Sequence, residues 1–503
     1  MARVANAEYT GRKHDENFTI LQAFEWYTEG EGKHWNKLKA LAPELGLAGI
    51  TAFWIPPPTK AANPASVGYD VYDLWDLGEF NQKGGKATKY GTKDELKKMI
   101  KTARDNGIVT YIDAVLNHKF GADSSETFEA AEVDYNDRTN EITDKYNIDG
   151  WTGFNFPGRK NKYSKMNWCF NHFTGVDYDN KTQKTQIFRI QYWANGVDSE
   201  NSNYDYLMGA DIDHSHPDVE KDLLKWGEWV LKEIGAQGFR FDAIKHIDES
   251  FISKFVENAR EKSGYPKLFA VGEYWKDSID DLDAYLAQFG TQFSVFDTPL
   301  HYNFKRAGEA GSSFDMRQIF DSTVVQKRPI DAVTLVDNHD TQVGQALESC
   351  VPMWFKPLAY SLILLRPDGY PCVFWGDLYG CEGPEGNPQP PMHQLADFVR
   401  ARKLFAYGEM RDYFDHPNCV GWVRVGDKWH DGCAVVICNG DAGYKWMDVG
   451  KEHAGEVWTD VLGWSQGEVQ INSDGWGQFR CPGGSVGIWT AKDARGRDEF
   501  AAK

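Results

Sequence analysis

The chain has 503 residues, of which 41% are hydrophobic and 26% charged, a composition typical of a globular enzyme with two or three domains. The formal net charge of −19 argues against nucleic acids and anionic membranes as partners. It is compatible with a neutral substrate and with bound cations. No apolar run reaches the length of about 18 residues that a transmembrane helix needs.

The first 118 residues alternate between strand-like and helix-like segments. The first helix-like segment has apolar side chains at helical spacing, such as Trp35 and Leu38, and the second strand stops at Pro56. This rhythm predicts a parallel sheet with right-handed crossovers. In chain order we expect a strand at 18–26, a helix at 34–49, a strand at 50–55, a helix at 93–106 and a strand at 108–116.

The rhythm stops at Lys119. Residues 119–216 are polar and rich in aromatic side chains, and they show no helical periodicity. Because a structureless loop of that length is implausible, we predict an inserted β-rich domain.

The alternation resumes after the insertion and ends near residue 407. Beyond it, apolar residues recur with period two, as at 420–425, 434–437 and 486–489, which is typical of an antiparallel sandwich. Between the insertion and residue 407, we expect helices at 219–235, 353–365 and 393–407, and strands at 238–244, 268–274, 293–297, 332–336 and 370–375.

Four segments of the chain have the same pattern, an apolar run followed by acidic or polar side chains. They cover residues 111–118, 238–246, 269–275 and 333–340. One such segment is ordinary. Four in order predict a parallel barrel with its chemistry at the C-terminal ends of the strands.

The segment at 238–246 contains the candidate nucleophile. Side chains alternate along a strand, so Arg240 and Asp242 share one face. A guanidinium at that position favours an ionised, immobilised carboxylate, which suits a nucleophile. An ordinary structural Arg–Asp pair would have the same sequence pattern, and this segment alone does not separate the two interpretations.

Taken together, the four segments resemble the signature regions of the α-amylase family of retaining glycoside hydrolases, most closely the liquefying type of bacilli and some fungi. The resemblance extends from residues 21–26 to the β-rich tail. It implies an α/β fold with a (β/α)8 TIM barrel, formed by 1–118 and 217–406. A β-rich domain at 119–216 follows the third strand, with a calcium site at its junction with the barrel, and 407–503 form a C-terminal β-sandwich.

Retaining hydrolysis needs two carboxyl groups about 5–5.5 Å apart, one as nucleophile and one as acid. Arg240 favours Asp242 as the nucleophile, and the neighbouring Tyr274 and Trp275 favour a raised pKa for Glu273 as the acid. The resemblance implies the same two roles. It makes Asp340 a third carboxylate that binds substrate hydroxyls and favours a distorted sugar ring.

The same resemblance implies a set of substrate-binding residues. His118 and His339 would hydrogen-bond the sugar at the cleavage subsite, although strand-end capping is the alternative for both. Asp113 would orient Arg240 and His118. Core packing is an equally good interpretation for Gln22 and Trp26. The full set of candidates is Arg240, His118, His339, Lys245, His246, Tyr69, Gln22, Trp26, Trp275 and Asp113.

The segment 203–213 has carboxylates at short polar spacing, and calcium prefers six to eight oxygen ligands. A solvated acidic loop is the alternative. The resemblance implies one structural Ca²⁺ held by the side chains of Asn117, Asp205 and Asp211 and by the backbone carbonyl of His246.

The chain departs from the bacterial pattern at one place. In that pattern, three further aspartates hold a second cation cluster, which consists of a sodium and another calcium. The matching positions here are Thr174, Ala194 and Ser215, so we expect this cluster to be absent.

The leading hypothesis is therefore an endo-acting α-1,4-glucan hydrolase, a monomer whose partners are polysaccharide and maltooligosaccharides. The alternatives are a glucanotransferase on the same fold and a catalytically silent binding subunit, which would typically lack the nucleophile or the acid. The N-terminus shows no apolar signal segment, so we expect a cytosolic protein, with a secreted mature form as the alternative. Cys372 and Cys438 lie in apolar runs and are expected to be buried free thiols.

Overall fold

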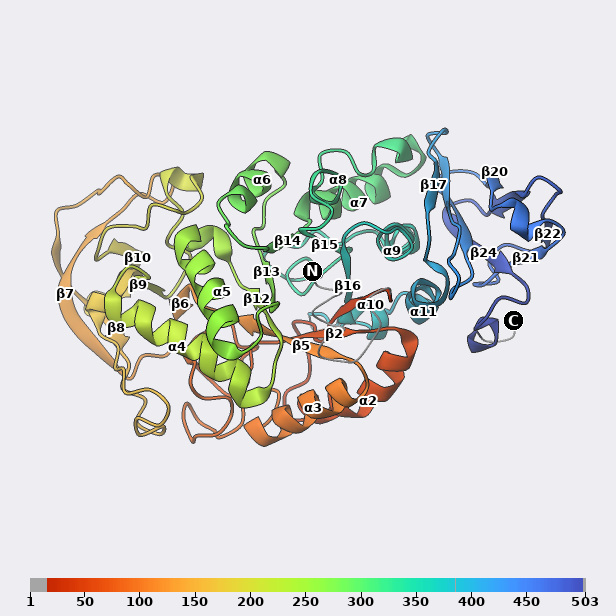
Figure 1. Cartoon of the computed structure of the whole chain (residues 1–503). Coiled ribbons are helices and arrows are strands. Elements are labelled where there is room, and N and C mark those ends of the chain that lie inside the picture. Colours follow the sequence, from red (N-terminus) through yellow and green to blue (C-terminus); the bar gives the residue numbers. More distant parts are fainter. Residues whose placement is uncertain (1–15, 385, 501–503) are drawn as a thin grey trace.

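A computed structural model describes residues 16–384 and 386–500. The first eight residues, on which the expectation about a signal segment depends, lie outside this range. In Figure 1 the barrel occupies the centre, with one β-sheet region on its left and the C-terminal sheets on its right. Within the described residues, no helix has the length and apolar character needed to cross a membrane.

Eight parallel strands close into a barrel, which confirms the predicted (β/α)8 architecture. Neighbours in the barrel follow each other along the chain, and the last strand pairs with the first. The barrel strands are β1 (Ile20–Gln22), β2 (Ala52–Ile55), β5 (Val109–Ala114), β12 (Gly238–Phe241), β13 (Phe269–Gly272), β14 (Ser294–Phe296), β15 (Ala332–Leu335) and β16 (Tyr370–Phe374).

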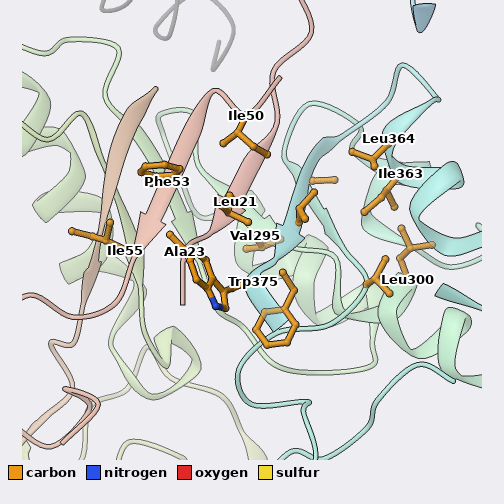
Figure 2. Close-up of a cluster of buried hydrophobic side chains, with 14 of the residues drawn as sticks. Leu21, Ala23, Ile50, Phe53, Ile55, Val295, Leu300, Ile363, Leu364 and Trp375 are labelled. Carbon is orange, nitrogen blue, oxygen red and sulfur yellow. The ribbon is translucent and has the colours of Figure 1, made fainter. Parts of the chain in front are cut away.

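Side chains alternate between the inside and the outside of this barrel. Ala52 and Trp54 belong to the cluster that fills the interior, whereas Phe53 and Ile55 belong to the larger core shared with the helices. Figure 2 shows part of that outer layer, which includes strand residues such as Leu21 and the helical residues Ile363 and Leu364. The barrel interior is therefore a packed core that positions the strand ends, and not a channel.

The strands are shorter than the sequence predicted, because their last residues leave the ladder to form the site. The fourth strand was expected to reach residue 244 but ends at Phe241. Ala243 then adopts a left-handed conformation with φ 50°, and Ile244–His246 form a 3₁₀ turn. The helix expected at 353–365 begins at Lys356, with Pro357 in its first turn, where proline is tolerated.

Helices surround the barrel and pack on its outer face (Figure 1). Good caps define several of them. Thr92 and Glu95 form a capping box at the start of α3, and glycines in the left-handed conformation follow α2 and α4. The helices are α2 (His34–Ala48), α3 (Lys93–Asp105), α4 (Pro217–Ile234), α5 (Glu249–Ser263), α6 (Ile279–Ala287), α7 (Thr298–Ala310), α8 (Val324–Lys327), α9 (Lys356–Leu364), α10 (Trp375–Tyr379) and α11 (Leu395–Phe405).

An antiparallel sheet of six strands is inserted between β5 and β12, in the order β6-β11-β9-β10-β7-β8. Its first strand, β6, follows directly after β5, and its last strand in the chain, β11, pairs with β6, so the two chain ends of the insertion lie at the same edge of the sheet. The strands are β6 (His118–Lys119), β7 (Ser124–Glu132), β8 (Tyr146–Gly153), β9 (Phe173–Asp179), β10 (Lys184–Arg189) and β11 (Ala210–Ile212). A separate short hairpin, β3 (Lys60–Ala61) with β4 (Val71–Asp73), lies in the loop after β2.

The C-terminal part consists of a six-stranded sheet in the order β17-β18-β19-β24-β21-β22 and a two-stranded sheet, β20-β23. Cys438 is fully buried there, and Cys372 is buried in the barrel, as the sequence predicted. The strands are β17 (Met410–Tyr413), β18 (Cys419–Arg424), β19 (Cys433–Cys438), β20 (Gly443–Asp448), β21 (Val457–Asp460), β22 (Val469–Gln470), β23 (Trp476–Cys481) and β24 (Ser485–Ala491).

Candidate active site

One buried guanidinium gathers three carboxylates at the C-terminal ends of the barrel strands. Nη1 of Arg240 donates to Oδ1 of Asp113 at 2.8 Å and to Oδ1 of Asp242 at 2.7 Å. Its Nη2 donates to Oε2 of Glu273 at 2.9 Å. Three strands, β5, β12 and β13, thus contribute to one charged cluster. Arg240 has no exposed surface, so its hydrogen bonds are made in a water-poor environment and hold the carboxylates firmly.

Glu273 is placed to carry a proton at neutral pH. Burial raises the pKa of its carboxyl group to about 7, although the charge of Arg240 lowers the pKa and the charge of Asp242 raises it. The amide of Ala243 donates to Oε2 of Glu273 at 3.1 Å. That bond depends on the left-handed conformation of residue 243, so the backbone strain at the end of β12 helps to orient this carboxyl group.

Asp340 lies on the loop after β15, beside His339. Nδ1 of His339 accepts a hydrogen bond from the amide of Gln22 at 3.0 Å, so Nε2 carries the proton and lies 3.3 Å from Oδ2 of Asp340. Burial holds the pKa of His339 well below its usual value, and the imidazole is neutral. Burial, and then the charge of Glu273, raise the pKa of Asp340 well above its usual value.

Aromatic rings form one wall of the site. The rings of Trp26 and Tyr69 are parallel, with centroids 6.0 Å apart, and His339 stacks on Tyr69 at 5.0 Å. Both Tyr69 and Trp54 donate to Oδ2 of Asp113, at 2.7 and 2.9 Å. Parallel, immobilised rings beside carboxylates offer flat apolar faces together with hydrogen-bonding groups.

One expected contact is not formed. Asp113 binds Arg240 as predicted, but the expectation that it also orients His118 is wrong. Oδ2 of Asp113 is occupied by Tyr69 and Trp54, and His118 donates instead through Nε2 to the carbonyl of Tyr69 at 2.8 Å. Both Asp113 and His118 therefore position the same tyrosine, from its hydroxyl and from its backbone.

The remaining candidates lie around this centre. Trp275 is 8% exposed and donates to the hydroxyl of Tyr302 at 3.0 Å. The side chain of Lys245 pairs with Glu200 of the inserted region at 3.1 Å. The imidazole of His246 hydrogen-bonds the carbonyl of Tyr204 at 2.7 Å, and burial lowers the pKa of this ring to about 3.

Two acidic side chains that form no ion pair with any described residue lie at the junction of the inserted sheet and the barrel. Asp205 and Asp211 are both 1% exposed. Burial raises the pKa of Asp205 to about 7, and burial together with the charge of Asp205 raises the pKa of Asp211 well above its usual value. The amide nitrogen of Asn117 donates to Asp211 at 3.1 Å, whereas its buried oxygen accepts no hydrogen bond from residues 16–384 or 386–500. This set of oxygens, with one acceptor unused, fits a hard cation such as calcium.

The three positions that depart from the bacterial cation cluster are used in other ways. The hydroxyl of Thr174 donates to Oδ2 of Asp211, and the amide of Ala194 donates to Oδ2 of Asp205 at 3.0 Å. Ser215 donates through its amide, at 2.9 Å, and through its hydroxyl to Oδ1 of Asp213. Each position thus supplies donors to a carboxylate where the bacterial pattern has an additional acidic ligand.

The sequence reasoning did not identify a buried ion-pair network behind Asp340. The ammonium of Lys356, at the start of α9, lies 2.8 Å from Oδ2 of Asp337 and also contacts Asp377. Oδ1 of Asp337 accepts from the hydroxyl of Thr341 at 2.8 Å, and this bond ties the network to the loop that carries Asp340. The only sequence signal was a charged residue at the start of an otherwise apolar helix.

A barrel with paired carboxylates on one arginine at its strand ends is the arrangement expected of a glycoside hydrolase. Comparison with known proteins gives the family. The sequence family described as "Alpha amylase, catalytic domain" matches residues 44–420, and "Alpha-amylase C-terminal" matches residues 434–490. The chain belongs to the α-amylase family.

Individual relatives agree with this assignment. An "Alpha-amylase" of Bacillus licheniformis is 48% identical over 481 residues, which cover 95% of this chain and 94% of that protein. A "Cytoplasmic alpha-amylase" of Escherichia coli (strain K12) is 41% identical over 492 residues, 95% of this chain and 99% of that protein. Among solved structures, an Anoxybacillus α-amylase is similar in fold, with a TM-score of 0.61 at 16% identity, covering 95% of this chain and 98% of that one.

Proposed function

We propose that this protein is an endo-acting α-amylase, which hydrolyses α-1,4-glucosidic bonds in starch, glycogen and related glucans. The single observation that carries the proposal is the carboxylate cluster on Arg240, in a chain of which 95% aligns at 48% identity with a protein named "Alpha-amylase". Polysaccharide and maltooligosaccharides are the proposed partners, and the protein acts as a monomer.

The proposed mechanism is a retaining double displacement. Asp242 attacks the anomeric carbon while Glu273 donates a proton to the leaving oxygen, and Glu273 then takes a proton from the water that releases the glycosyl group. The two carboxyl groups bind adjacent nitrogens of one guanidinium, at 2.7 and 2.9 Å. This arrangement favours the shorter separation, about 5–5.5 Å, of retaining enzymes over the larger one that accommodates a water molecule.

Other residues bind and distort the sugar. Asp340 accepts hydrogen bonds from substrate hydroxyls, with His339 beside it as a neutral donor. Tyr69 and Trp26 provide the stacking wall, and His118 holds Tyr69 through its carbonyl. Arg240, Asp113, Gln22, Trp275, Lys245 and His246 complete the proposed set of residues in and around the subsites.

We propose one structural calcium at the junction of the inserted sheet with the barrel. Asn117, Asp205 and Asp211 would hold it with their side chains, and His246 with its backbone carbonyl. Bound there, the ion would supply positive charge to two buried carboxylates, and its ligands would lie on the segment between β5 and β6, on the inserted region and on the turn that follows β12. These residues would thereby hold the turn next to Asp242. In this scheme 119–216 form the inserted domain, between the barrel segments 1–118 and 217–406, and 407–503 form the C-terminal domain.

The test is product analysis on starch, amylose and pullulan, followed by NMR of the first products. We expect short α-1,4-oligosaccharides released from within amylose, in the α-anomeric form. Longer products from a short maltooligosaccharide would instead identify a glucanotransferase, the second candidate on this fold. The β-anomer as first product would exclude Asp242 as the nucleophile.

A further inference from the structure

One buried side chain, that of Gln342, links the loop that carries Asp340 to the loop that carries Trp26. We propose that Gln342 is a positioning residue for the hydrolysis, which holds Trp26 where its ring can contact the sugar. The inference rests on the proposed function, because the role of Trp26 in substrate binding is part of that proposal.

Both polar atoms of the Gln342 carboxamide are bound by the loop that follows β1. Oε1 of Gln342 accepts a hydrogen bond from the backbone amide of Trp26 at 3.0 Å, and its Nε2 donates to Oε2 of Glu25 at 3.0 Å. Gln342 is 3% exposed and Glu25 is 2% exposed. Hydrogen bonds shielded from water in this way are costly to break, because each buried partner is left unsatisfied.

The chemistry at this position suits a glutamine. Its two partners are an N–H donor and a carboxylate acceptor, and a primary amide offers one acceptor and one donor group at the end of one side chain. A glutamate at 342 would place a second carboxylate against Glu25, and a methionine would leave both partners of residue 342 unpaired. Oε2 of Glu25 also accepts from the amide of Tyr27 at 2.8 Å, so the bond from Gln342 joins a turn that is already fixed.

Gln342 belongs to the same tight turn as Asp340. Oδ1 of Asn338 accepts from the backbone amides of Asp340 at 2.8 Å and of Thr341 at 2.9 Å. The amide of Gln342 donates to the carbonyl of Asn338 at 3.3 Å. The turn is therefore closed by its own bonds. Loss of the Gln342 side-chain bonds should release Trp26 and leave Asp340 in place.

The ring of Trp26 depends on this anchor for its place in the aromatic wall. It is half-buried and lies parallel to Tyr69, with centroids 6.0 Å apart, and nearly parallel to His339, at 6.2 Å. Such a ring contributes to binding through its flat face while its position is held. The bound sugar would meet this wall both before and during the reaction. An unanchored ring should therefore weaken binding and leave the chemical step nearly unchanged.

The test measures kcat and KM for maltoheptaose with full-length variants. Gln342→Met and Gln342→Asn are each expected to raise KM roughly two- to twelvefold, the range expected for one aromatic contact, while kcat stays near the parental value. Gln345→Met is the matched control and should have the parental KM. Gln345 lies on the same loop, but its Nε2 donates to the hydroxyl of Tyr27 at 3.0 Å. In a Trp26→Ala background, which should itself raise KM, Gln342→Met should cause no further rise.

The outcomes separate a positioning role from a purely structural one. If Gln342 only supported the fold, its variants would contain less active protein, so kcat would fall and KM would not change. That result would overturn the inference. Gln342→Asn keeps the test decisive if Gln342→Met fails to fold, because the shorter side chain stays polar but cannot reach both partners. An equal rise of KM in Gln345→Met, or a further rise in the Trp26→Ala background, would also overturn it. A parent that does not cleave maltoheptaose would refute the proposed function itself, and the inference with it.

Discussion

The ion-pair network behind the loop that carries Asp340 leads to a quantitative prediction for Lys356→Met. In the parent, one ammonium serves two carboxylates, those of Asp337 and Asp377, and all three side chains are at most 9% exposed. Methionine retains most of the apolar stem but removes the charge. Two buried carboxylates are then left without a cation. Removing one partner of a buried pair costs about 3–5 kcal/mol, and we expect a loss of this size in the free energy of unfolding.

The loss of stability in the variant is also expected to depend on pH. Burial already raises the pKa of Asp337 and of Asp377, with Lys356 acting in the opposite direction. Without the ammonium both pKa values in the folded state rise further above their unfolded values. A carboxyl group whose folded pKa is raised binds its proton more tightly when folded, so stability increases as pH falls. The deficit of the variant is therefore expected to be larger at pH 8 than at pH 5.

The assay is urea-induced unfolding of parent and variant at both pH values, with free calcium held constant. Lys492→Met is the control, because Lys492 is 64% exposed and pairs with an exposed Glu468, and a loss below about 1 kcal/mol is expected. Adding Asp377→Asn to Lys356→Met restores the parental net charge of the cluster and should recover part of the loss. A deficit below 1 kcal/mol at pH 8, or one that grows as pH falls, would refute the reasoning.

Three further predictions concern catalysis and the cation. Asp242→Asn, Glu273→Gln and Asp340→Asn should each lower kcat by roughly 10³-fold or more while thermal unfolding stays near that of the parent; parental turnover in any of them would contradict its proposed role. Because Glu273 is the proposed acid and burial raises its pKa to about 7, kcat/KM should decline as pH rises through about 7, and a profile that is flat up to about pH 9 would rule it out as the acid. Metal analysis of the desalted protein should find one calcium, and free calcium at 100 times its dissociation constant should add about 2.7 kcal/mol of stability. Asp211→Asn should weaken both the binding of the calcium ion and the activity. Two or more integral calcium ions per chain would contradict the expectation that the second cation cluster is absent.

Periodicity and the residue types at the strand ends predicted much of the arrangement of the chain. Apolar residues at helical spacing in 34–49 predicted α2, and the four apolar segments ending in acids predicted the barrel and the edge at which the candidate site lies. These features are local, because strand alternation and helical spacing act between residues a few positions apart. The pairing of Arg240 with Asp242 belongs to the same group, since two residues separated by one on a strand must share a face.

Contacts between distant segments could not be predicted in this way. The partners of Asp113 include Trp54 and Tyr69, which lie 59 and 44 positions away, whereas His118 bonds the carbonyl of Tyr69. Lys356 is placed between Asp337 and Asp377 only when β15, α9 and α10 have packed together. Competition among donors for one carboxylate oxygen is settled by three-dimensional distance, which one-dimensional spacing does not encode.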